Sequence, residues 1–180
     1  RHCGRCQVPR FRLGRDRVMR GGLRPLLLCG AFGLLHPAAA FDLQGHRGAR
    51  GIAPENTLAG FRAALAVGVT TLETDLALTR DGVLVLSHDP RLSPALTRGP
   101  DGAWLTADGP PIVELDVQQV ARYDIGRLNP AHRYASLWPE QKAADGESMP
   151  TLEALVELVR AARSPGGAPV RLSIETKVTP

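Results

Sequence analysis

The chain has 180 residues, of which 43% are hydrophobic and 22% are charged, with 19 Gly and 15 Pro. This length suits one domain with its own core, and the ordinary composition excludes the disordered and collagen-like classes. Aromatic residues make up only 4% of the chain, which argues against a stacking surface for single-stranded nucleic acid.

The net charge of +4 is unevenly distributed along the chain. Residues 1–40 contain eight Arg and a single acidic residue, whereas residues 41–180 carry 14 basic and 17 acidic side chains. The basic character therefore belongs to the first 40 residues and not to the expected folded body. Because nucleic-acid-binding domains carry their positive charge on the folded surface, no nucleic-acid partner is expected.

The first 40 residues have the features of a secretory signal peptide. A positively charged stretch precedes the apolar run 26–35, and residues 37–40 form a small-residue cleavage pattern. The run is too short to span a bilayer, which takes about 20 residues, so no transmembrane span is expected in the mature chain. A buried amphipathic helix is the alternative. We expect a signal peptide at 19–40 cleaved near Ala40, an upstream non-native extension at 1–18, and a periplasmic or secreted protein.

Strand and helix patterns alternate through the body of the chain, which indicates βα units around a parallel sheet. Both longer helices carry apolar residues at steps of three and four, namely Leu58, Phe61 and Leu65 in the first and Leu152, Leu155, Val156 and Val159 in the second. The predicted elements in chain order are a strand at 41–45, a helix from Asn56 or Thr57 to Gly68, strands at 70–79 and 83–87, a helix near 114–122, a helix from 151 and a strand at 170–175.

Residues 90–150 differ in composition from their surroundings, since they hold eight of the 15 Pro and every Trp and Tyr of the chain. A structureless loop of this length is improbable inside a compact domain. We therefore interpret the segment as a small insertion subdomain. Its aromatic side chains are expected to form the core of that subdomain, with lipid binding as the alternative.

The Asp-Gly pair at 81–82 predicts a tight hairpin between two strands. With a two-residue turn, Asp75 is expected to oppose His88, with Cβ atoms about 4.5–5.5 Å apart. Glu73 lies two residues along the same face of its strand. Two carboxylates and an imidazole are thus predicted to converge.

Two acidic side chains on one strand face repel each other unless a cation joins them, and oxygen ligands favour Mg²⁺ or Ca²⁺. A solvated strand face with an incidental histidine is the alternative, because a register slip of one residue would turn His88 to the other face. Two further polar pairs follow predicted strands. In the first pair, His46 can transfer a proton while Arg47 binds an anion beside it. The second pair, Glu175 and Lys177, adds a carboxylate and a cation. Each of these pairs is also common as a plain surface pair.

Seven short motifs follow one another with natural spacing through residues 41–180. They are His46-Arg47-Gly48, Pro54-Glu55-Asn56-Thr57, Glu73-Thr74-Asp75, Asp81-Gly82, Ser87-His88-Asp89, Tyr123-Asp124-Ile125-Gly126 and Glu175-Thr176-Lys177. Together they resemble the glycerophosphodiester phosphodiesterase family, and in particular its exported bacterial members. The resemblance implies a TIM (β/α)8 barrel with a small insertion after the second barrel strand.

The resemblance also implies an activity, which is the hydrolysis of glycerophosphodiesters to glycerol 3-phosphate and an alcohol with a divalent metal cation, Ca²⁺ or Mg²⁺. The substrate partner would be a small glycerophosphodiester. The roles it implies are metal ligation by Glu73, Asp75 and Glu175, acid–base catalysis by His46 and His88, phosphate binding by Arg47 and Lys177, and support by Glu55. Between the two histidines, we expect His46 to be the base and His88 the acid.

A complete barrel typically needs about 250 residues, which is more than follow the predicted signal peptide. We therefore expect only the N-terminal part of a barrel, divided into 41–89, the insertion 90–150, and a truncated continuation at 151–180. An open half-barrel exposes strand edges and an apolar face, so this piece alone is expected to be weakly active or inactive. The alternatives are a phospholipase D-like lysolipid hydrolase of the same fold, and a truncated inactive fragment or exported binding protein. The sequence does not discriminate the metal, the alcohol or the oligomeric state.

Overall fold

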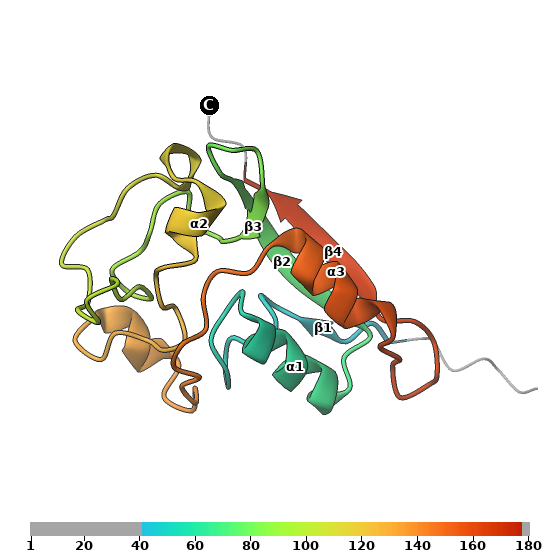
Figure 1. Ribbon diagram of the computed structural model, residues 1–180. Helices are drawn as coiled ribbons and strands as arrows, with labels where there is room; N and C mark the ends of the chain where they lie inside the picture. The colour runs from blue at the N-terminus through green and yellow to red at the C-terminus, as the bar shows by residue number, and fades with distance from the viewer. Residues whose placement is uncertain (1–40, 178–180) are drawn as a thin grey trace, which may run out of the picture. The chain divides into compact units, whose positions relative to one another are not determined.

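The computed structural model describes residues 41–177, so the predicted signal peptide and the upstream extension lie outside the described residues. Within this part, one mixed sheet is covered on one face by two helices, and a long irregular segment lies beside it (Figure 1). The strands are β1 (Gln44–Gly45), β2 (Thr71–Leu78), β3 (Leu84–Leu86) and β4 (Arg171–Thr176), and the two covering helices are α1 (Leu58–Val67) and α3 (Leu152–Arg160).

Strand β2 is the centre of the sheet. β1 pairs parallel to its beginning through Gly45 and Leu72, and β4 pairs parallel along most of its length, from Thr71 to Leu76. β3 returns antiparallel against the far end of β2. The predicted α/β arrangement around a parallel sheet is therefore confirmed, although β1 is shorter than the strand predicted at 41–45.

Both covering helices begin at side chains that cap free backbone N–H groups. The Thr57 hydroxyl accepts a hydrogen bond from the Gly60 backbone, and Thr151 does the same for Ala154. Gly68 ends α1 in the left-handed conformation with φ of 91°, which glycine adopts without steric cost. Of the two caps predicted for α1, Thr57 is thus the one that is used.

The main core lies between these helices and the sheet. Leu155 and Val159 of α3 are buried, and the partly buried Leu152 packs against the same cluster. Val156 is 43% exposed, so the prediction that it faces inward was wrong. Successive helical residues are about 100° apart, and the stripe formed by the other three turns Val156 to the flank of the helix. The buried cluster comprises Phe61, Ala64, Val69, Leu72, Leu76, Leu86, Leu155, Val159 and Val170.

The hairpin between β2 and β3 closes with a three-residue turn at 80–82, and not with the predicted two-residue turn. The Thr79 backbone N–H donates to the Val83 carbonyl at 3.0 Å, and Gly82 occupies the left-handed region with φ of 82°. This is the common three-residue loop with a left-handed residue at its end. The Thr79 hydroxyl stabilises it by donating to Asp81 and by accepting from the Val83 N–H.

This turn shifts the hairpin register by one residue. Leu76 pairs with Leu86, so Asp75 lies opposite Ser87, whose N–H donates to the Asp75 carbonyl at 3.0 Å. His88 follows after the end of β3. The prediction that His88 faces Asp75 across the hairpin was therefore wrong, because the extra turn residue displaces every pair by one position.

Residues 90–150 contain only short helical turns, which are η1 (Ile112–Glu114), α2 (Val117–Val120) and η2 (Arg133–Leu137). The helix predicted near 114–122 is thus much shorter than expected. The segment shares a second core with the hairpin, formed by Val85, Leu92, Ile112, Val120, Ile125 and Met149. Of the four Trp and Tyr side chains, Tyr123 packs against this core, whereas Trp104, Tyr134 and Trp138 make other contacts. The expected aromatic core was wrong for those three.

Among residues 41–177, the structure contains no helix of the length and apolarity needed to cross a lipid bilayer.

Candidate active site

Three carboxylates meet where the middle of β2 lies beside the carboxyl end of β4. Glu73 and Asp75 point to the face of β2 opposite the helices, since Leu72 and Leu76 occupy the other face. Glu175 lies on β4 directly beside Asp75 in the parallel register. One oxygen from each carboxylate lies within 4.8 Å of the others. The structure therefore brings together the predicted metal-ligating residues.

This carboxylate cluster fits a divalent cation. Asp75 is only 1% exposed, and its buried Oδ1 lies 3.1 Å from the Nζ of Lys177. Its Oδ2 accepts a hydrogen bond from Asn56 Nδ2 at 3.2 Å. A buried carboxylate requires positive charge around it, and a set of three hard oxygen ligands matches the preference of Mg²⁺ and Ca²⁺.

Lys177 supplies part of that positive charge from the end of β4. Its Nζ lies 2.5 Å from Glu175 Oε1 and 3.1 Å from Asp75 Oδ1. The hydrogen bond to Glu175, and then the one to Asp75, raise the pKa of Lys177 above its ordinary value. The lysine is thus a cation at neutral pH, placed at the edge of the carboxylate cluster.

Three contacts hold Arg47 in a fixed position next to the same carboxylates. Its backbone N–H donates to Glu73 Oε2 at 2.7 Å, its Nη1 donates to Glu55 Oε1 at 2.8 Å, and its Nε lies 3.4 Å from Asp75 Oδ2. The residue has a φ of 52°, which is uncommon for a side-chain-bearing residue and persists only where several contacts enforce it. Burial lowers the pKa of Arg47, but Glu55 and Asp75 outweigh this and shift it upward.

Glu55 is buried between Arg47 and a residue that sequence reasoning did not single out, Tyr134. The Tyr134 hydroxyl donates to Glu55 Oε2 at 2.5 Å from a point 79 residues further along the chain. Burial, and then the Glu55 carboxylate, raise the pKa of this phenol, so it stays protonated and serves as a donor. No local pattern announces such a contact, because it depends on how residues 90–150 pack.

Asn56 has a role beyond the helix cap considered for it from the sequence. Its Nδ2 donates to Asp75, while its Oδ1 accepts a hydrogen bond from the Thr74 hydroxyl at 2.9 Å. The residue is buried and has a φ of 50°, in a region that Asn tolerates better than most residues. Asn56 thereby orients the central carboxylate of the cluster.

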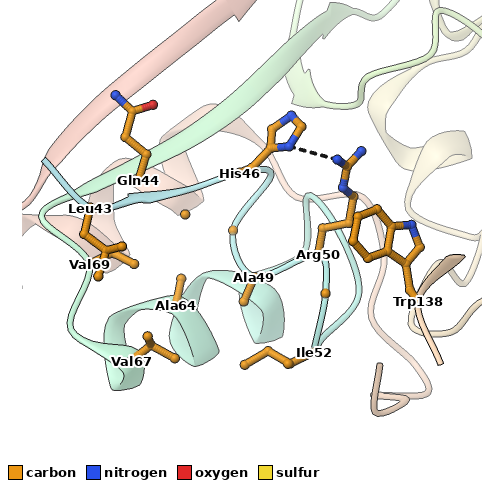
Figure 2. A pocket seen from close by; sticks show the side chains of 13 residues that line it. Leu43, Gln44, His46, Ala49, Arg50, Ile52, Ala64, Val67, Val69 and Trp138 are labelled. Atoms are coloured by element: carbon orange, nitrogen blue, oxygen red, sulfur yellow. Dashed lines mark hydrogen bonds between the residues drawn. The ribbon is translucent and has the colours of Figure 1, made fainter. Parts of the chain in front are cut away.

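His46 lies beside the carboxylate cluster because β1 pairs Gly45 with Leu72, which places the next residue next to Glu73. Its Nε2 is 3.8 Å from Glu73 Oε2. On the other side of the ring, Nδ1 lies 2.9 Å from Nη2 of Arg50. Figure 2 shows this contact at the rim of an apolar pocket between β1, α1 and Trp138.

His88 enters the site from the loop after β3. Its Nδ1 lies 2.8 Å from Asp89 Oδ1. Together with Arg47, Glu55 and Tyr134 it lines a pocket of about 280 Å³. The two predicted histidines therefore reach the site by different routes, His46 next to the carboxylates and His88 next to the Arg47–Glu55 pair.

Comparison with known proteins matches residues 46–175 to the Glycerophosphoryl diester phosphodiesterase family. The human protein glycerophosphodiester phosphodiesterase 1 is 35% identical over 136 residues, which cover 74% of this chain and 35% of the human one. A Silicibacter pomeroyi crystal structure assigned to the glycerophosphoryl diester phosphodiesterases is 38% identical with a TM-score of 0.72, covering 81% of this chain and 48% of that one.

A third relative was solved with a bound product. The Oleispira antarctica phosphodiesterase in complex with sn-glycerol-3-phosphate is 27% identical, with a TM-score of 0.51 over 76% of this chain and 44% of that one. The chain thus spans less than half the length of these three relatives. The family match covers most of the chain and includes nearly all of the site described above. The chain therefore belongs to the glycerophosphoryl diester phosphodiesterase family.

Proposed function

We propose that the protein carrying this chain is a metal-dependent enzyme that hydrolyses glycerophosphodiesters to sn-glycerol 3-phosphate and an alcohol. The observation that carries the proposal is the cluster of Glu73, Asp75 and Glu175, with ligand atoms within 4.8 Å, beside His46 and Arg47. Family membership supports the reaction class, and the Oleispira antarctica relative has sn-glycerol-3-phosphate as its product.

The carboxylate cluster would hold the divalent cation, for which both Mg²⁺ and Ca²⁺ are suitable. When bound, the cation would neutralise the negative charge that develops on the phosphate oxygens. Lys177 and Arg47 lie on two sides of Asp75 and would add to that positive field. A phosphodiester anion is thereby attracted to the one point where these cationic groups converge.

The contacts of the two histidines support different roles for them. Asp89 can only accept at His88 Nδ1, so Nδ1 carries a hydrogen and Nε2 offers its lone pair to the proton of the attacking oxygen. Arg50 can only donate at His46 Nδ1, so the hydrogen of that neutral ring lies on Nε2 and can form a hydrogen bond to the departing oxygen without leaving the ring. These contacts favour His88 as the base, a role that the sequence analysis assigns to His46, and favour His46 as a hydrogen-bond donor to the departing oxygen.

We further propose that the described sheet is the first part of a TIM barrel, with residues 90–150 as an insertion. The supporting observations are the two parallel pairings of β2, the separate second core, and the share of the relatives' length that the chain covers. The activity is accordingly proposed for the protein with its full barrel. The signal-peptide pattern of residues 19–40 supports export of that protein to the periplasm or beyond.

The test is release of glycerol 3-phosphate from glycerophosphocholine by the full-length protein, measured with a coupled dehydrogenase assay. We expect activity that disappears after chelation and returns on addition of Mg²⁺ or Ca²⁺. A lysolipid assayed in parallel separates this reaction from a lysolipid hydrolase of the same fold. Full activity after complete metal removal, or cleavage of the lysolipid alone, would reject the proposal.

A further inference from the structure

The loop at 50–52 is fastened to residues 138–142 by contacts that none of the recognised motifs includes. Gln141 Nε2 donates to the Arg50 carbonyl at 2.8 Å, and the Lys142 N–H donates to the Ile52 carbonyl at 3.0 Å. These two hydrogen bonds place the indole ring of Trp138 against the loop. The irregular segment thereby makes a second contact with the rim of the site, next to Tyr134, whose ring centre lies 6.5 Å from that of Trp138.

The Arg50 guanidinium occupies the space between Trp138 and His46. Its Cζ lies 4.5 Å from the centre of the Trp138 ring, and its Nη2 lies 2.9 Å from His46 Nδ1 (Figure 2). A planar guanidinium stacks on an aromatic face and still presents donors at its edge, which an ammonium group does not do. The stacking therefore fixes the direction in which Arg50 donates.

This contact determines which nitrogen of His46 carries hydrogen. Arginine remains protonated and has no acceptor, so His46 Nδ1 must accept and the hydrogen lies on Nε2. Nε2 is the nitrogen that faces the carboxylate cluster, 3.8 Å from Glu73 Oε2. A ring free to rotate, or with its hydrogen on Nδ1, would present a lone pair to that side instead.

We infer that Arg50 is a positioning residue that holds the His46 ring with its Nε2 hydrogen directed into the site, and that Trp138 holds Arg50 in place. The inference rests on the proposed function for the role of His46, but the state of the ring is independent of that function. Trp138 does not line the pocket that His88 shares with Arg47, whereas Arg50 does. The two leaving groups used below therefore separate the positioning of His46 from a direct contact of Arg50 with the phosphodiester.

Nitrogen-15 NMR of the histidine rings in the full-length protein tests the state of the ring directly. We expect the wild-type His46 ring to show hydrogen on Nε2 only. In Arg50→Met, which removes the donor but keeps an apolar stem, the two neutral forms should become mixed. A wild-type ring with hydrogen on Nδ1, or a ring unchanged in Arg50→Met, overturns the inference whether or not the protein is an active phosphodiesterase.

Kinetics with two substrates that differ in their leaving group test how the position of the His46 hydrogen affects the rate of hydrolysis. Arg50→Met should lower kcat about tenfold to a hundredfold on glycerophosphocholine, whose alcohol is a poor leaving group, because misplaced catalytic groups cost rates of this order. On a p-nitrophenyl diester, whose phenolate leaves without help, the loss should stay within about threefold. An equal loss on both substrates would indicate a merely structural role and overturn the inference.

Three further variants complete the test. Arg50→Lys should recover only part of the lost rate, since an ammonium does not stack as a guanidinium does. Trp138→Leu should lower kcat on glycerophosphocholine severalfold, in proportion to a partly buried cation–π contact. Arg62→Met, at an exposed position of α1, is the matched control and should match the wild type on both substrates. If the wild type cleaves neither diester while the ring behaves as expected, the proposed function fails and the positioning inference stands.

Discussion

Residues of β2 and β4 reach the candidate active site through strand register, whereas Tyr134 and Trp138 reach it through single side-chain contacts from residues 90–150. In the sheet, the pairing of Asp75 with Glu175 is one step of a continuous parallel ladder. In the irregular segment, each contribution depends on one hydrogen bond or one stacked ring. The site therefore has a rigid half, formed by β2 and β4, and an irregular half, formed by residues 90–150, in which each contact can change independently of the others.

The irregular segment is held together by charge as well as by its small core. Arg98 lies 2.5 Å from Asp124 and 2.6 Å from Asp145, and Arg127 pairs with Asp145 in turn. Pairs at partly exposed positions such as these contribute little stability individually. The placement of Tyr134 and Trp138 is therefore expected to be lost under milder conditions than the carboxylate cluster on the sheet.

The largest effect is expected at the rigid half, in Asp75→Asn. Removing the central carboxylate of the cluster should lower kcat/KM on glycerophosphocholine about a thousandfold or more, because a bound cation contributes several kcal/mol to transition-state stabilisation. Binding of Mg²⁺ and Ca²⁺, measured by titration calorimetry, should be lost in parallel. Glu157→Gln, on the exposed side of α3, is the control and should bind metal normally. Unchanged metal affinity in Asp75→Asn would contradict the assignment of the cluster.

The second largest expected effect is a loss of stability caused by a substitution at Gly126, in the irregular half. A Cβ at this position would clash with the Ala144 carbonyl oxygen, which is backbone and has little freedom to move. Gly126→Ala is expected to destabilise the protein by about 3 kcal/mol or more, the upper end of the cost of overpacking. Denaturant unfolding measures this loss. Gly166→Ala, where an added Cβ meets nothing within 4 Å, should be close to neutral. Equal stability of the two variants would show that the segment is free to rearrange.

Tyr134→Phe tests whether the two halves are independent, because it removes one hydroxyl that joins them. Glu55 Oε2 would lose the donor that lies 2.5 Å away, at a cost of about 1–3 kcal/mol for a buried acceptor left without its partner. Since Glu55 also accepts from Arg47, KM for glycerophosphocholine should rise severalfold while metal affinity stays unchanged. A parallel loss of metal affinity would show that the two halves are not separable.

The smallest effect is expected for Asp145→Asn and depends on pH. The hydrogen bond from Arg127 lowers the pKa of Asp145 below its ordinary value of 3.8. A lowered folded-state pKa stabilises the fold above that ordinary value, and the stabilisation is lost as pH falls through the lowered pKa. The melting temperature of Asp145→Asn should thus be slightly below that of the wild type at pH 7 and equal to it in strong acid. A difference that persists in strong acid would assign the effect to packing.

Much of the sheet and its caps could be predicted from local patterns. Alternation along 70–79 correctly placed Glu73 and Asp75 on one face, and the end of a helix at Gly68 was predicted, with its start left open between Asn56 and Thr57. The hairpin register was missed by one residue, because the Asp-Gly pair is compatible with a two-residue and a three-residue turn. Here the Thr79 hydroxyl favours the longer one. Local signals therefore indicated a turn but did not specify its length.

The residue types of the site, two acids on one strand face and a third at the end of another, can be read from the sequence, because side-chain alternation depends only on the backbone of each strand. The contributions of Asn56, Tyr134 and Arg50, and the arrival of His88 from a loop and not across the hairpin, become visible only in the folded chain. These contacts join residues that are distant in sequence or lie in irregular loops. Their geometry follows from how the cores pack, which no local periodicity records.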